Sequence, residues 1–96
     1  MHDLTKFQRD CLYAIAGMDE PKGLAIKDEL DDYYEGEIHH GRLYPNLDEL
    51  VEKGLVEKGE VDRRTNSYDI TRRGRREIVA RREWEDKYLN REQIVD

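Results

Sequence analysis

Cysteine is almost absent from the chain, which contains only Cys11. A single cysteine cannot close an intramolecular disulfide or build a cysteine-rich zinc site. Long apolar runs are also missing. None approaches the roughly 20 residues of a membrane-spanning helix, and the N-terminus lacks the apolar segment of a signal peptide. We therefore expect a soluble, cytoplasmic protein that does not enter a membrane.

Apolar residues are scarce as well. They make up 36% of the 96 residues, whereas charged residues make up 42%. A chain of this length forms one domain with one modest core, in which a large catalytic pocket would not fit. The sequence has no Ser/His/Asp order, no glycine-rich phosphate loop and no carboxylate pair in an apolar setting. These absences argue against an enzyme, and we expect no cofactor.

Charge is distributed unevenly along the chain. The net charge of −6 alone would disfavour an anionic partner, but residues 1–62 carry −9, residues 83–96 carry −3, and residues 63–82 carry +6. The basic stretch contains eight arginines, which are Arg63, Arg64, Arg72, Arg73, Arg75, Arg76, Arg81 and Arg82. Such a stretch on an acidic body is typical of an anion-binding face, and the alternative is a helix with solvated charged faces. The acidic excess is also compatible with a salt-loving host.

The spacing of apolar residues predicts four helices and one hairpin. We expect helices over residues 5–17, 23–34 and 40–54, strands over 55–61 and 67–71, and a last long helix over 71–90. Thr5 and Gln8 form a capping-box pattern at the start of the first helix. Gly54 suits the left-handed position that follows the third helix.

The same spacing predicts which side chains are buried. In the second helix, Ile26, Leu30 and Tyr33 form the inner stripe and Lys27 faces water. Cys11 lies midway along the apolar first helix, so we expect a small core residue there. A redox sensor would need thiolate character and solvent access, which its neighbours do not clearly supply.

The order of these elements predicts a fold that is mainly α with a small β-hairpin. Three helices followed by a hairpin are the winged helix-turn-helix arrangement, in which the third helix enters the DNA major groove. We therefore expect a DNA-binding domain over residues 1–71. A long C-terminal dimerisation helix and tail would follow over residues 72–96.

The chain resembles the PadR family of transcriptional regulators. The resemblance is carried by Gly41-Arg42-Leu43-Tyr44-Pro45-Asn46-Leu47, Leu50, Gly54-Leu55-Val56, Arg64, Tyr68, Ile70-Thr71 and Gly74. The Leu-Tyr-Pro element in that setting is fairly specific, and within the family the chain is most similar to short, acidic haloarchaeal members, among them stress-response regulators. The resemblance implies a homodimer that binds a palindromic operator, usually as a repressor. Many members have a larger C-terminal region that helps to bind effectors. Here one helix and a short tail are expected after the wing, so we expect no small-molecule effector.

The start of the third helix carries the expected base-reading residues. Arg42 can pair with guanine through its planar fork, and Asn46 can do the same for adenine. His39, His40 and Tyr44 are expected at phosphates, near the free N–H groups of the helix start. Arg42 could instead be solvated, and Tyr44 could instead pack against the second helix. The adjacent histidines predict no metal site, because they point apart on a helix and no third ligand is spaced to join them.

The hairpin tip and the last helix supply the remaining basic candidates. Arg63 and Arg64, assisted by Thr65 and Asn66, are expected to enter a minor groove or to pair with flanking phosphates. They could also form an ordinary exposed turn. Arg72 opens the last helix, where a cation beside the positive helix end requires an anion. That anion is either DNA phosphate or an acidic residue of the N-terminal half.

The aromatic residues of the last helix indicate self-association. Trp84 and Tyr88 are four residues apart, beyond the part of the helix that can pack on the domain, and a projecting aromatic pair favours a dimer contact. We place Leu89 and Leu4 at the same interface. The sequence thus predicts a dimeric regulator of double-stranded DNA. The alternative is a winged-helix module of the transcription machinery that binds proteins.

Overall fold

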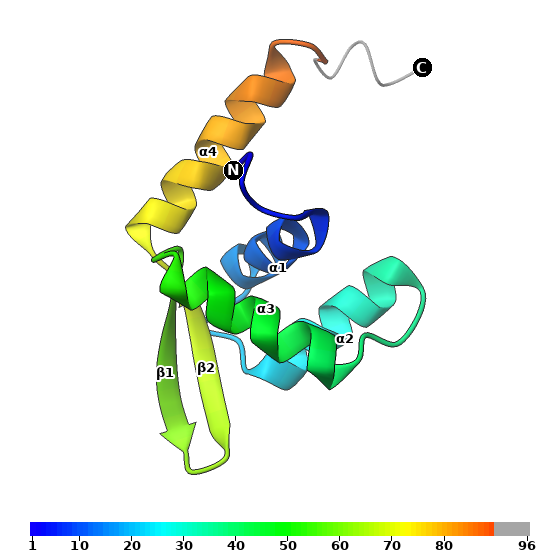
Figure 1. Ribbon diagram of the computed structural model, residues 1–96, viewed down its shortest axis with the longest axis vertical. Coiled ribbons are helices and arrows are strands. Elements are labelled where there is room, and N and C mark those ends of the chain that lie inside the picture. The colour runs from blue at the N-terminus through cyan, green and yellow to red at the C-terminus, as the bar shows by residue number, and fades with distance from the viewer. Residues whose placement is uncertain (90–96) are drawn as a thin grey trace.

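The computed structural model describes residues 1–89 and shows the predicted order of elements (Figure 1). The elements are α1 (Lys6–Gly17), α2 (Gly23–Tyr34), α3 (His40–Glu52), β1 (Val56–Asp62), β2 (Thr65–Ile70) and α4 (Arg72–Asp86). The last helix ends at Asp86, earlier than the spacing predicted. Residues 90–96, which include the expected tail, lie outside the described residues.

Helix α1 lies at the centre of the core and packs against α2, α3, β2 and α4. Its Cys11, Leu12 and Ile15 are fully buried, as the prediction for Cys11 required. Helices α2 and α3 and the two strands contribute further buried apolar side chains, which are Ile26, Leu30, Leu43, Leu47, Leu50, Val56, Tyr68 and Ile70. One contiguous cluster thus holds the three helices and the base of the hairpin together.

The expected helix ends are confirmed at α1 and α3. Thr5 and Gln8 form the capping box: the Gln8 N–H donates to the Thr5 hydroxyl at 3.1 Å, and the Thr5 N–H donates to the Gln8 side chain at 3.2 Å. After α3, Gly54 adopts φ +75°, which favours glycine. The Leu55 N–H then donates to the Leu50 carbonyl at 3.0 Å, which closes the helix end as a Schellman motif does.

The hairpin of β1 and β2, which we call the wing, stands out from the helical body (Figure 1). Its antiparallel register pairs Val56 with Ile70 at the base and Asp62 with Thr65 at the tip. The expectation that Thr65 and Asn66 form part of the turn is wrong, because both pair with β1 and belong to β2. Only Arg63 and Arg64 form the turn. The wing is tied to the start of α2, since the Tyr68 N–H donates to the Pro21 carbonyl at 2.9 Å.

Two side chains of α2 differ from their predicted positions. Tyr33 is 68% exposed, and the neighbouring Tyr34 packs on the core in its place, next to Phe7. Lys27, expected in water, is buried, because its ammonium pairs with Asp31 at 2.8 Å while its apolar stem lies along the protein. Both corrections concern residues at the margin of the apolar stripe, where helical spacing alone does not decide burial.

Candidate nucleic-acid interface

Helix α3 has a buried side and an exposed side. Leu43, Leu47 and Leu50 are fully buried, whereas Gly41 and Pro45 at the start of the helix are exposed. Pro45 does not break the helix. Its missing N–H would have bonded to the carbonyl of Gly41, so the lost hydrogen bond affects only the first turn. The exposed side near its start is therefore open to a partner.

The turn that leads into α3 is held by Asp31. Its carboxylate accepts hydrogen bonds from the Ile38 N–H at 2.6 Å and from the Lys27 ammonium at 2.8 Å. The Lys27 hydrogen bond is the main reason that the pKa of Asp31 lies below its usual value, and the Ile38 N–H adds to it. Glu35 ends α2 in the left-handed conformation at φ 55°. These contacts join the end of α2 to the turn that leads into α3.

A cleft lies between the starts of α2 and α3 and the end of the wing, and we call it the α2–α3–wing cleft. It has a volume of about 450 Å³. Its lining residues are Lys22, Gly23, Leu24, His40, Tyr44, Arg64, Thr65 and Asn66. Five of them were predicted from the sequence to contact DNA. The structure thus brings the start of the third helix and the arginine-bearing wing together.

Lys22 and Leu24 were missed at the sequence level. Lys22 is the N-cap residue of α2, a position where Ser, Thr, Asp or Asn usually supplies a hydrogen-bond acceptor. A lysine there was an available signal, because it leaves the first N–H groups of the helix for another acceptor. Leu24 is 60% exposed beside it and adds an apolar contact to the cleft.

The helices that begin at the cleft differ from the other two. Thr5 and Thr71 cap α1 and α4 with their side chains. Lys22 and His39, the N-cap residues of α2 and α3, make no side-chain cap hydrogen bond with any residue among 1–89. Two helix ends with free N–H groups and a positive dipole therefore open near one cleft, which suits an anion.

Tyr44 lies inside the cleft and also packs within the domain. Its hydroxyl lies so close to the start of α2 that a Cβ added at Gly23 would be 2.6 Å from it. Its side chain is half-buried against the core, and the His40 ring packs on it at a tilt, with ring centroids 5.6 Å apart. Tyr44 thus packs against α2 and also lines the cleft with a polar side chain.

Arg42 and Asn46 lie on the flank of α3 that faces α1. The Arg42 guanidinium stacks over the Phe7 ring at 4.0 Å, although the residue as a whole is exposed. The Asn46 amide is turned toward α1, where its oxygen accepts from Gln8 at 3.0 Å, and its nitrogen donates to the Arg42 carbonyl at 2.7 Å. The interpretation that Asn46 points outward is therefore corrected: neighbouring groups already use both ends of its amide.

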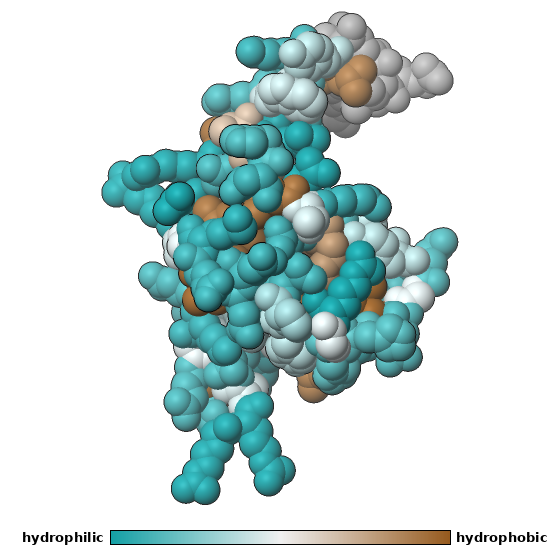
Figure 2. Space-filling model, viewed as in Figure 1, coloured by the Kyte–Doolittle hydropathy of each residue, from teal (hydrophilic) through white to brown (hydrophobic). Residues whose placement is uncertain are grey.

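The end of the wing is hydrophilic and projects from the body (Figure 2). Arg63 and Arg64 are both exposed. The turn between them is stabilised by Asp62, whose carboxylate accepts from the Arg64 N–H at 2.9 Å. This backbone hydrogen bond is the largest cause of the lowered pKa of Asp62. The two arginine side chains are thus presented by a turn that does not depend on them.

Arg72 begins α4 at the base of the wing, at the end opposite the Arg63–Arg64 turn. A strand of this length spans about 20 Å at roughly 3.3 Å per residue. Arg72 therefore does not join the α2–α3–wing cleft. It lines a separate groove along α4 with Arg75, Arg76, Val79, Ala80 and Glu83.

The residues expected at a dimer interface separate into two groups. Trp84, Tyr88 and Leu89 are 49%, 61% and 57% exposed, and the two aromatic rings lie 5.2 Å apart. Leu4 does not join them, because only 7% of it is exposed and it packs in the core of its own chain. Exposed aromatic and apolar side chains thus lie at the end of α4 and in the residues directly after it.

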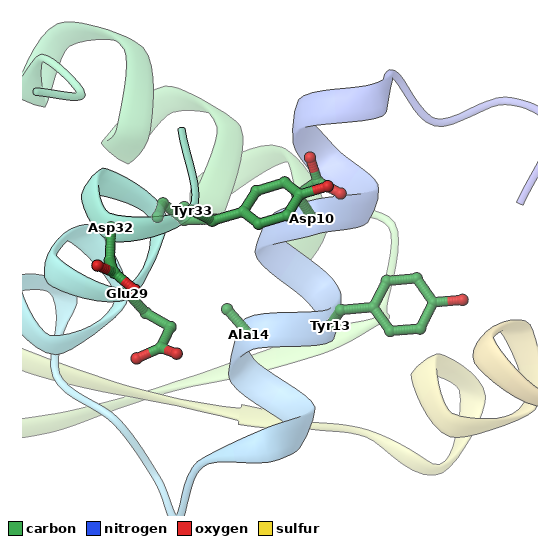
Figure 3. Close-up of a pocket in the computed structure, with 7 residues that line it drawn as sticks. Asp10, Tyr13, Ala14, Glu29, Asp32 and Tyr33 are labelled. Carbon is green, nitrogen blue, oxygen red and sulfur yellow. The ribbon is translucent and has the colours of Figure 1, made fainter. Parts of the chain in front are cut away.

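A second concave surface, which we call the acidic groove, lies between α1 and α2 (Figure 3). Its lining residues are Asp10, Tyr13, Ala14, Glu29, Leu30, Asp32 and Tyr33. It shares no lining residue with the α2–α3–wing cleft, and its three carboxylates would repel phosphate.

Other chemistry has little support in the described part of the chain. Burial raises the pKa of the Cys11 thiol to about 12, and the nearby Asp10 adds to the effect, so the thiol is not activated. Residues 1–89 contain no group of three His, Cys, Asp or Glu side chains that could hold a metal ion. No helix among them is long and apolar enough to cross a membrane.

The fold is that of a winged-helix protein, and comparison with known proteins specifies the class further. Residues 12–80 match the family described as "Transcriptional regulator PadR-like family", so the chain belongs to the PadR-like family. The family and the RosR relatives below are transcriptional regulators and not enzymes. No curated protein sequence matches this chain.

Solved structures of RosR from H. salinarum are similar over most of their length. The RosR structure from crystals grown in NaBr has 48% sequence identity to this chain, with a TM-score of 0.87 over 95% of this chain and 84% of that one. The complex hsRosR-SG shares 50% identity, with a TM-score of 0.88 over 94% and 80% of the two chains. A crystal structure of MarR, at 26% identity and a TM-score of 0.66, covers 95% of this chain and 69% of that one.

Proposed function

We propose that this PadR-like regulator binds double-stranded DNA sequence-specifically, as a homodimer on a pseudo-palindromic operator. The start of α3, within a recognition segment at about residues 40–54, enters the major groove. The wing, at about residues 62–66, contacts the minor groove or the backbone. The observation that carries the proposal is the α2–α3–wing cleft, in which Lys22, His40 and Arg64 share one surface with two helix starts.

The acidic body does not oppose this arrangement. Asp48 is paired with Lys58 of β1 at 3.2 Å, which offsets its charge, and the Glu49 carboxylate is held toward α1 by a hydrogen bond from Gln8. Only the opening turns of α3 then approach phosphate. The domain would meet the duplex at an angle, with the wing beside the helix start.

Within this interface, Arg42 is the proposed base-reading residue and Lys22 the proposed phosphate contact. A guanidinium stacked on Phe7 loses little further conformational freedom when its edge bonds to guanine O6 and N7. Lys22 stands at the start of α2, where the helix dipole adds to its charge. Arg63 and Arg64 contribute charge that does not depend on the DNA sequence.

The exposed residues at the end of α4 and directly after it support the homodimer. Trp84, Tyr88 and Leu89 form an apolar surface of the kind that a second copy covers. A two-fold axis near this helix would place two recognition helices in successive major grooves, about 34 Å apart.

The acidic groove supports the second candidate function, a protein-interaction module of the transcription machinery. Its exposed tyrosines and three carboxylates suit a basic protein segment. Such a module would need no contact between the α2–α3–wing cleft and DNA, so DNA binding distinguishes the two functions.

The test is selection from a random duplex library followed by anisotropy titration. We expect a selected consensus duplex that binds at least tenfold more tightly than a scrambled duplex of the same composition. Arg42→Ala should lose that discrimination, with a cost of about 1–3 kcal/mol for one bidentate base contact. A wild-type chain that selects no consensus contradicts sequence-specific binding, and an unchanged ratio in the variant removes Arg42 from base reading.

A further inference from the structure

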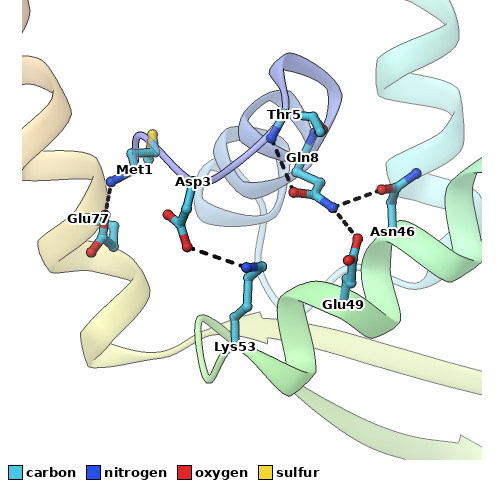
Figure 4. Close-up of polar contacts among 8 residues, drawn as sticks. All are labelled: Met1, Asp3, Thr5, Gln8, Asn46, Glu49, Lys53 and Glu77. Carbon is cyan, nitrogen blue, oxygen red and sulfur yellow. Dashed lines mark hydrogen bonds and ion pairs between the residues drawn. The ribbon is translucent and has the colours of Figure 1, made fainter.

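Gln8 is a buried polar residue whose side chain joins two elements far apart in sequence. Only 4% of it is exposed. Its carbonyl oxygen accepts from the Thr5 N–H, and its amide nitrogen donates to Asn46 at 3.0 Å and also to Glu49 (Figure 4). Both of these partners lie on α3, so one side chain of α1 satisfies its own helix start and holds the recognition helix.

The cap of α1 explains only half of this arrangement. A capping box uses the side-chain oxygen of its third helical residue, so Glu and Gln serve equally well there. A glutamate at position 8 could not donate to Asn46 and would add a second carboxylate beside Glu49. The contacts with α3 therefore require the amide of Gln8, whereas the cap does not.

The network continues to the proposed base-reading residue. The Asn46 amide donates to the Arg42 carbonyl at 2.7 Å, and the Arg42 guanidinium stacks on Phe7, the residue before Gln8. Two consecutive residues of α1 thus hold the flank of α3 that carries Arg42. The same contacts turn the Glu49 carboxylate toward α1.

We infer that Gln8 is a specificity-determining positioning residue, which acts on DNA recognition through Asn46 and Glu49 without touching the duplex. It holds the Arg42 flank in one arrangement before DNA binds, and it keeps the Glu49 carboxylate from phosphate. The inference rests on the proposed function, because it concerns how the recognition helix is presented.

The test compares variants of the full chain on the selected consensus duplex and its scrambled counterpart. Gln8→Glu keeps the acceptor of the capping box but replaces the donor with a charge that repels Glu49. We expect the ratio of the two affinities to fall about tenfold in this variant. The double variant Gln8→Glu with Glu49→Gln restores one donor–acceptor pair and should recover most of the ratio.

Thr5→Ala is the matched control, since it removes the cap of α1 without touching α3. It should lower the melting temperature and leave the ratio unchanged. Gln8→Met, which keeps the volume and removes the donor, replaces Gln8→Glu if that variant does not fold, and it should also lower the ratio.

Two results would overturn the inference alone: a wild-type ratio in the folded Gln8 variants, or an equal loss in Thr5→Ala. A failure of the double variant to recover the ratio would overturn the role of Glu49 and, with it, the inference as stated. If the wild-type chain itself does not distinguish the two duplexes, the proposed function fails and the inference fails with it.

Discussion

Replacing both wing arginines tests the electrostatic role of the wing. Arg63 and Arg64 are exposed, and their turn is held by a backbone hydrogen bond to Asp62, so Arg63→Ala with Arg64→Ala should fold as the wild type does. A hydrogen bond to a charged group contributes about 1.5 kcal/mol, so losing two phosphate contacts should weaken binding at low salt roughly a hundredfold. The loss should be the same on consensus and scrambled duplexes, because phosphate contacts carry no sequence information.

The salt dependence of the binding constant gives a more exact expectation than the loss of affinity does. Each phosphate contact contributes about 0.9 to the slope of log K against log salt, so the double variant should have a slope smaller by about 1.8. Arg72→Ala with Arg75→Ala is the matched control, because it removes the same charge from α4 at the other end of the wing. At about 0.1 M salt the Debye length is about 10 Å, shorter than the wing, so the control slope should change little. Equal slope changes in both variants, or none in either, would refute the reasoning.

Three further predictions concern α1 and α4. Gly74→Ala should destabilise the domain by about 1–2 kcal/mol in thermal melts, because the new Cβ would lie 2.3 Å from the Leu55 carbonyl oxygen and overpacking outweighs the gain in helix propensity. Gly41→Ala is the control: a Cβ there would have no atom within 4 Å, so this variant should not be destabilised. Equal melting temperatures for the two variants would refute the clash at Gly74. Cys11, whose thiol pKa is raised to about 12, should react with a disulfide reagent at pH 8 only after unfolding, and rapid labelling of the native protein would contradict its burial. Trp84→Arg should give monomers in light scattering, whereas a persistent dimer would place the interface elsewhere.

Local signals in the sequence predicted the architecture well. The capping box at Thr5, the left-handed turn at Gly54 and the alternation at Tyr68 and Ile70 each involve residues close in sequence, so their physical causes can be read from one segment. Their order along the chain then favours one known arrangement of helices and hairpin.

Side-chain direction on the flanks of the helices could not be read in the same way. Asn46 points toward α1 because of Gln8, which lies 38 residues away in sequence, and no local pattern shows that partner. Tyr34 packs on the core in place of Tyr33, because its hydroxyl donates a hydrogen bond to Asp10 of α1 and its ring packs against Phe7. Helical spacing places both tyrosines near the margin of the stripe, and tertiary contacts decide between them.

The most direct test of the central claim is to map amide chemical shifts on addition of the selected consensus duplex. If the starts of α2 and α3 and the end of the wing together meet the duplex, the largest changes should occur at Gly23, Gly41 and Arg64. The amides of Tyr13 and Tyr33 in the acidic groove should change little. Large changes confined to the acidic groove, with the α2–α3–wing cleft unaffected, would contradict the account.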